Sequence, residues 1–301
     1  VLPAWKVAQQ DLTDAIKDGG HQISRALDRA MVRRLMVAGQ VAGSCVLLII
    51  AGMMVRGIQN VMAASVSFDY DRAASLDVQV AASRAERGCT VHDISYASPK
   101  GGRVPAYLVV PEGTGPFAGI IVQHGAPGSR ESSLERAKGY SRTGAVVLAI
   151  SAPFARRGAG PRDMLRFDER DHDEQVQLVV DLMRGVDLLA SRPDVDPKRL
   201  AFVGGSFGAA IGGLLAGVER RIKAYALWVG DGGPISHMRA LGERGPFGQG
   251  PSEALDRWVA IMEPIEPIHF IAKAAPAALL LQSARRDQYV PVSSAEAWQR
   301  A

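Results

Sequence analysis

Residues 199–218, RLAFVGGSFGAAIGGLLAGV, place an apolar run, a glycine-flanked serine and a small-residue segment in immediate succession. The apolar run is typical of a strand buried on both faces, and the Gly and Ala residues that follow would let a helix pack closely against a sheet. Ser206 stands between them, with Gly204 and Gly208 completing a G-x-S-x-G pattern. An ordinary tight connection is the alternative, but this context favours a sharp strand-to-helix turn with an exposed serine hydroxyl.

Such a turn has a chemical consequence. The hydroxyl of Ser206 would stand at the carboxyl end of a strand, where it can attack a carbonyl carbon. The backbone N–H of Phe207 would then point toward the oxygen on which negative charge develops during acyl transfer. Ser206 is therefore the candidate nucleophile, and Phe207 supplies one candidate N–H group of an oxyanion hole.

The rest of the chain alternates strand and helix patterns from Cys89 onward. Residues 90–98 and 103–112 alternate apolar and polar side chains around the turn PKGG, which predicts a hairpin. Later apolar runs alternate with helical patterns, so we expect an α/β fold with a mostly parallel sheet and helices on both faces. The predicted later strands lie in 117–125, 145–153, 200–204, 222–230 and 276–284, and the predicted helices in 132–144, 173–191, 207–218 and 293–301.

Three motifs carry a resemblance to a known superfamily: GIIVQHGAPGSR, PDVDPKRLAFVGGSFGAAIGG and LLLQSARRDQYVPV. With them, residues 85–301 resemble the α/β-hydrolase superfamily, in particular dienelactone-hydrolase-like esterases and the catalytic domains of prolyl-oligopeptidase-type peptidases. The resemblance implies the α/β-hydrolase fold and a serine hydrolase that cleaves carboxylic esters through an acyl-enzyme on Ser206. A peptidase of the prolyl-oligopeptidase type and an inactive binding protein with the hydrolase fold are the alternatives.

The resemblance also assigns roles to other residues. The loop QHGAPG would supply the second oxyanion donor from the backbone around Gly125 and Ala126, with His124 as a supporting loop residue. Asp287, just after the strand in 276–284, would be the acid that orients the catalytic histidine. Asp231, after the preceding strand, is the second choice, because some members of the superfamily place the acid there.

The histidine base has no obvious position in the sequence. The superfamily order is Ser, then Asp or Glu, then His, yet all six histidines precede Asp287. We therefore expect a hydrolase domain, residues 62–301, that is apparently truncated at its C-terminus, with the last strand and the catalytic histidine beyond Ala301. Without that histidine these 301 residues would be nearly inactive. A protein that is not a triad hydrolase is the alternative.

Residues 1–61 form an N-terminal extension. Within it, residues 35–55 carry no charge and lie between Arg34 and Arg56, which predicts a transmembrane or signal-anchor helix and a membrane-anchored or exported protein. Small residues at 63–64 would suit signal cleavage. A buried helix is one alternative, and translation from Met62, giving a cytoplasmic protein, is another.

Composition excludes several function classes. Residues 1–60 hold 7 Lys/Arg and 4 Asp/Glu, leaving a nearly balanced 28 and 27 for the remainder, without a basic cluster for nucleic acid. The two cysteines lack metal-ligand spacing, and we expect Cys45 to be a buried free thiol. The serine motif holds no complete dinucleotide fingerprint. We therefore expect a small-molecule ester as substrate, with no metal, cofactor or nucleic acid.

Overall fold

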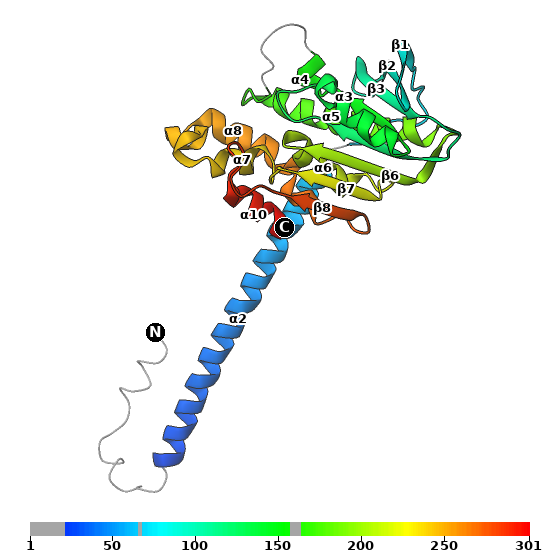
Figure 1. The fold of residues 1–301 in the computed structure, drawn as a ribbon. Coiled ribbons are helices and arrows are strands. Elements are labelled where there is room, and N and C mark those ends of the chain that lie inside the picture. The colour runs from blue at the N-terminus through cyan, green and yellow to red at the C-terminus, as the bar shows by residue number, and fades with distance from the viewer. Residues whose placement is uncertain (1–21, 66–67, 157–163) are drawn as a thin grey trace. The chain divides into compact units, whose positions relative to one another are not determined.

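The computed structural model describes residues 22–65, 68–156 and 164–301. The chain divides into two compact units, Val1–Met62 and Ala63–Ala301. Helix α2 (Gln22–Ser65) is the element described in the first unit. The eight-stranded sheet and the remaining described helices belong to the second unit, which corresponds to the expected hydrolase domain and is called the hydrolase unit below (Figure 1).

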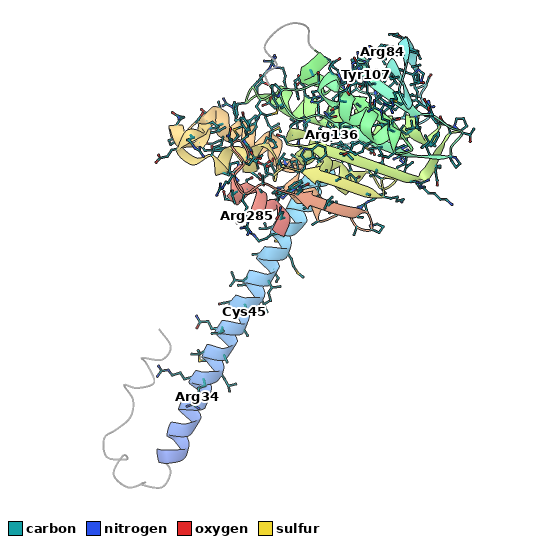
Figure 2. The ribbon with its side chains drawn as sticks, in the orientation of Figure 1. Arg34, Cys45, Arg84, Tyr107, Arg136 and Arg285 are labelled. Carbon is teal, nitrogen blue, oxygen red and sulfur yellow. The ribbon has the colours of Figure 1, made fainter. Side chains whose placement is uncertain are left out.

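Helix α2 contains the predicted apolar segment. Within it, Arg33–Val55 is long and apolar enough to cross a membrane, and none of this span is buried. The alternative of a buried core helix therefore has no support. Figure 2 labels Arg34 and Cys45 along this helix, and the Cys45 thiol is exposed, so its predicted burial is wrong. The prediction is wrong because the apolar side chains around Cys45 are not packed against a core.

The sheet of the hydrolase unit has the strand order β1-β2-β3-β5-β4-β6-β7-β8. Its first three strands pair antiparallel, β3 pairs antiparallel with β5, and the strands from β5 to β8 in that order are parallel. This arrangement confirms the predicted mostly parallel sheet and its hairpin. The strands are β1 (Gln79–Glu86), β2 (Cys89–Ala97), β3 (Arg103–Pro111), β4 (Phe117–Gln123), β5 (Ala145–Ile150), β6 (Val195–Gly205), β7 (Ala224–Trp228) and β8 (Ala278–Gln282).

Helices cover both faces of this sheet. On one face α3 packs on a small core that includes Ala137 and Val147. Arg136 of α3 is labelled in Figure 2, and its guanidinium carbon lies 4.4 Å from the centre of the Trp228 ring. On the other face α5 and α6 bury the larger core. The helices are α3 (Arg130–Arg142), α4 (Pro153–Arg156), α5 (Glu169–Ala190), α6 (Phe207–Val218), α7 (Pro234–Ala240), α8 (Glu253–Met262), α9 (Ile268–Ile271) and α10 (Val292–Arg300), with 3₁₀ turns at Gly242–Arg244, Pro246–Gln249 and Glu263–Ile265.

The central strands follow directly from the sequence. All six residues of β5 are buried, as expected for a parallel strand covered on both faces. Two strands differ from the prediction. β1 was not predicted, because its side chains are almost all exposed and its place is set by backbone pairing with β2. β6 begins at Val195, before the strand predicted in 200–204, because Val195 pairs with Phe117 of β4.

We predict that residues 63–301 fold without the N-terminal unit. The buried apolar residues of the described structure begin at Phe68, and the apolar span of α2 buries none of its residues. Calorimetry should compare the full-length protein in detergent with a form lacking residues 1–62. We expect their melting temperatures to agree within about 4 °C, which is the shift that roughly 1 kcal/mol of stability produces in a domain of this size. A shorter form that does not fold would show that α2 belongs to the core.

Candidate active site

Ser206 lies in a strained turn between β6 and α6. Its φ and ψ are 54° and −123°, in the left-handed half of conformational space that non-glycine residues rarely occupy. The turn is held on both sides: Ser206 N donates to Trp228 O at 3.0 Å, and Ser206 O accepts from Ala209 N at 2.8 Å. The serine is therefore fixed at the carboxyl end of β6, as the G-x-S-x-G pattern predicts.

The glycines around Ser206 are required by close packing. A Cβ on Gly204 would collide with Gly208 O, and one on Gly205 would collide with the indole of Trp228. A Cβ on Gly208 would collide with the carbonyl of Gln123 at the end of β4. The clashes at Gly204 and Gly208 are with backbone atoms that have no room to move, so these two positions admit only glycine while the turn keeps its shape.

Two backbone segments lie close enough to Ser206 to form the predicted oxyanion hole. Phe207 is the first residue of α6, so its N–H belongs to the unpaired, partially positive end of the helix. The loop after β4 approaches from the other side, since a Cβ on Gly125 would lie 3.3 Å from Ser206 Cβ. Ala126 and Phe207 both line the cavity in front of the serine.

His124 has a supporting role in this loop, as expected. It is buried, and its Nδ1 lies 2.8 Å from Gly125 O. Ala152 N donates to its Nε2 at 3.0 Å, so Nε2 is the acceptor and Nδ1 carries the proton. The ring thus joins the ends of β4 and β5 and fixes the backbone next to Ser206.

A cavity of about 490 Å³ opens in front of Ser206. Its walls are largely apolar, from Phe154 and Leu165 on one side to Ile211 and Met238 on the other. Residues 231–272 contribute Asp231, Gly233, Pro234, His237, Met238 and Pro267 to the lining. Trp258 and Met262 of the same segment belong to the core.

The two candidate acids lie in different settings. Asp287 follows β8, and its Oδ1 accepts from Tyr289 N at 2.8 Å and Val290 N at 2.9 Å. Those two residues line the cavity, although Asp287 itself does not. Asp231 follows β7, is buried, and lines the cavity directly. The sheet thus brings both acids to the end at which Ser206 lies.

The histidines are spread over the unit. His21 lies outside the described residues, whereas His92 of β2 bonds Ser83 of β1, His172 bonds Asp173, and His269 bonds Glu263. Among the histidines that the structure describes, His237 is the one that lines the Ser206 cavity. The expected base beyond Ala301 stays a prediction.

His237 and Asp231 form a pair that the sequence analysis did not anticipate. Asp231 Oδ2 lies 2.6 Å from His237 Nδ1, with the histidine on α7 and the aspartate just before it. A signal was present in the sequence, because an aspartate directly after a strand precedes the histidine by six residues. The contact itself depends on the Gly232–Gly233–Pro234 turn, in which Gly233 adopts a φ of 121°.

Helix α7 is held in place by a buried carboxyl group. The Glu266 side chain accepts from Ser236 N at 2.8 Å and Ile235 N at 3.3 Å, both in the first turn of α7. Burial, with a smaller contribution from nearby Glu263, raises the pKa of Glu266 to about 8 against the opposing effect of these hydrogen bonds. Glu266 is therefore largely protonated at neutral pH.

No metal cluster is found in the described part of the chain, where His, Cys, Asp and Glu nowhere gather in groups of three or more able to hold an ion. The site instead offers a serine on a strained turn, two sets of backbone N–H groups and carboxylates at neighbouring strand ends. These features define the chain as a serine hydrolase with the α/β-hydrolase fold.

Comparison with known proteins narrows this class. Residues 74–229, just over half of the chain, match the acetyl xylan esterase (AXE1) family model, and the chain belongs to that family. It is a carboxylic-ester hydrolase that acts on small-molecule esters. No curated protein matches the sequence significantly.

Solved structures agree on the fold. The chain is similar to acetyl xylan esterase 1 from Thermoanaerobacterium sp. JW/SL YS485, with 16% identity, a TM-score of 0.63, and coverage of 80% of this chain and 83% of that one. An acetyl xylan esterase from Paenibacillus sp. R4 is 17% identical, with a TM-score of 0.56 and coverage of 81% of this chain and 91% of that one. A prolyl endopeptidase is 20% identical, with a TM-score of 0.53 and coverage of 71% of this chain and 32% of that one. This likeness to a peptidase shows a shared fold alone.

We predict that Glu266 makes the stability of the hydrolase unit fall as pH rises. Its pKa is about 8 in the folded protein against 4.5 when exposed, so unfolding releases a proton between roughly pH 5 and 8. Over that window the free energy of unfolding should fall by up to about 1.4 kcal/mol per pH unit, the limit for one proton. The fully protonated group contributes most below pH 4.5.

The test is urea unfolding at several pH values for the wild type, Glu266→Gln and the control Glu253→Gln. The glutamine side chain stays neutral at every pH, so the Glu266→Gln variant should show a flatter pH dependence. Glu253 is 89% exposed, and its replacement should leave the slope as it is in the wild type. Parallel slopes for the wild type and Glu266→Gln would contradict the assignment.

Proposed function

We propose that the protein hydrolyses acetyl and other short acyl esters of carbohydrates through an acyl-enzyme on Ser206. Ser206 Oγ attacks the ester carbonyl, and the N–H groups of Phe207 and of the backbone around Gly125 and Ala126 stabilise the oxyanion. The alcohol leaves with a proton, and water then releases the acid. The family membership supports the acetyl ester as the bond that is cleaved.

Asp287 is the proposed acid that orients the histidine base. Its place after β8 matches the superfamily pattern, and two backbone N–H groups fix its carboxylate. The superfamily order predicts the base C-terminal to this acid. The base must reach Ser206 Oγ and the acid together, because the three groups act as a unit.

A single observation carries the proposal: Ser206 has a φ of 54° between β6 and α6 and opens onto the 490 Å³ cavity. Strain of this kind persists only where the surrounding structure imposes it, and it clusters at functional sites. A serine in a merely structural turn would need neither the strain nor the adjoining cavity.

We predict that Ser206→Ala in the full-length protein lowers the hydrolysis of p-nitrophenyl acetate by at least about 10³-fold, because the nucleophile is lost. The melting temperature should change little, since the methyl side chain fits the same turn. Ser83→Ala is the matched control, because Ser83 is a serine of the same unit that lies outside the cavity, where its Oγ is 2.7 Å from His92 Nδ1. Undiminished turnover by a folded Ser206→Ala protein would refute the assignment.

The span Arg33–Val55 supports a second proposal, that the protein is held at a membrane by α2. Its length suits the hydrocarbon core of a bilayer, and Arg33, Arg34 and Arg56 provide charges at its two ends. The hydrolase unit would then act at a membrane surface.

We predict that the full-length protein stays in the membrane fraction after carbonate extraction, whereas the form lacking residues 1–62 is soluble. N-terminal sequencing of the membrane fraction should find the apolar span intact. A mature protein that begins after residues 63–64 would instead identify the segment as a cleaved export signal.

A further inference from the structure

The Asp231–His237 pair lies in the wall of the Ser206 cavity, and the proposed mechanism does not use it. Asp231 follows β7, and Ser206 is bonded through its own N–H to Trp228 O, the last residue of that strand. Serine and aspartate therefore start from adjacent points of the sheet. His237, on α7, lines the same cavity.

The hydrogen bond to Asp231 sets the chemistry of the His237 ring. An ionised carboxylate only accepts, so His237 Nδ1, at 2.6 Å from Asp231 Oδ2, carries the proton. In the neutral ring Nε2 then holds a lone pair and is an acceptor. Within the described part of the chain, Nε2 has no hydrogen-bond partner, and the side chain is 25% exposed.

The ring is fixed rather than adaptable. His237 N donates to Gly233 O at 2.8 Å, and Glu266 binds the two preceding backbone N–H groups of α7. Asp231 Oδ1 also accepts from Gly233 N, at 3.4 Å. A side chain held on this many sides presents its free nitrogen in one direction, which is what selective binding requires.

Two other polar side chains in the cavity are already engaged in hydrogen bonds. Asp171 accepts from Arg166 N, Phe167 N and Trp258 Nε1, and Gln175 donates to Ile265 O. The wall near His237 is formed by apolar groups such as Met238 and Pro234. A hydrogen-bond acceptor in such a wall selects strongly for a ligand donor that can reach it.

The described structure contains no hydrogen bond between Ser206 Oγ and His237, which favours a binding role over that of the base. We propose that His237, held by Asp231, determines substrate specificity: its Nε2 accepts a hydrogen bond from a hydroxyl on the alcohol half of the ester. The site would thus prefer esters of polyhydroxylated alcohols. This inference rests on the proposed function of Ser206.

The test compares two acetate esters that differ in the hydroxyls of the alcohol, glycerol monoacetate and propyl acetate, with the full-length protein. For His237→Phe we expect the ratio of kcat/KM for glycerol monoacetate to that for propyl acetate to fall about ten- to hundredfold, mainly through KM, as for a lost hydrogen bond of roughly 1.5–3 kcal/mol. His237→Gln, which keeps an acceptor, should recover part of the ratio.

His269→Phe is the matched control, because His269 bonds Glu263 outside the cavity, and this variant should keep the wild-type ratio and activity. A fluorophosphonate probe should still label Ser206 in both His237 variants. An unchanged ratio of the two kcat/KM values in both His237 variants would overturn the proposal. An equal loss of kcat/KM on both esters, together with lost labelling of Ser206, would also overturn it and would make His237 the base. Failure of the wild type to label at Ser206 would instead refute the proposed nucleophile.

Discussion

The site depends on a contact between backbones, where the first turn of α6 rests against the end of β4. Gly208 sits against the carbonyls of Gln123 and His124, and Gly205 sits under the Trp228 indole at the end of β7. The ends of β4, β6 and β7 are thereby drawn together around Ser206. The loop proposed to complete the oxyanion hole follows the first of these strands, the serine follows the second and Asp231 follows the third. A larger side chain at these glycines would separate all three.

This contact explains which parts of the site could be predicted from the sequence. The strained turn is encoded locally, because Gly204 and Gly208 flank the serine and a buried parallel strand reads as a continuous apolar run. The places of Ser206 and Phe207 in this turn could therefore be predicted without a structure, whereas the roles of Gly125 and Ala126 were implied only by the superfamily resemblance. The pairing of Asp231 with His237 could not, because it is created by the φ of 121° at Gly233 and by the remote carboxyl of Glu266.

The misjudged elements share a different cause. β1 exposes nearly all of its side chains, so it carries no hydrophobic signal, and only its pairing with β2 makes it a strand. Cys45 lies in an apolar helix whose side chains are exposed, a setting in which hydrophobicity does not report burial. Sequence patterns predict packing against a core well, but they do not report backbone pairing at an edge or an apolar surface left unpacked.

The segment that covers the cavity is anchored by buried polar contacts rather than by apolar packing alone. Trp258 of α8 donates to Asp171 of α5 at 2.8 Å, and burial raises the pKa of that carboxyl. Gln175, one turn further along α5, donates to Ile265 O at 2.9 Å. Together with the hydrogen bonds from α7 to Glu266, these bonds fix part of the cavity wall before a substrate arrives, so the fold sets the positions of its lining groups.

A site built in this way separates catalysis from specificity. The proposed oxyanion donors are backbone N–H groups, which constrain the residues at positions 125, 126 and 207 mainly through space. Part of the cavity wall is made by residues 231–272, whose side chains the proposed chemistry of the serine leaves free to vary. Proteins with this fold can therefore share the turn and the sheet while presenting different cavity walls to the alcohol. The two acetyl xylan esterase structures share the fold with this chain at only 16–17% identity.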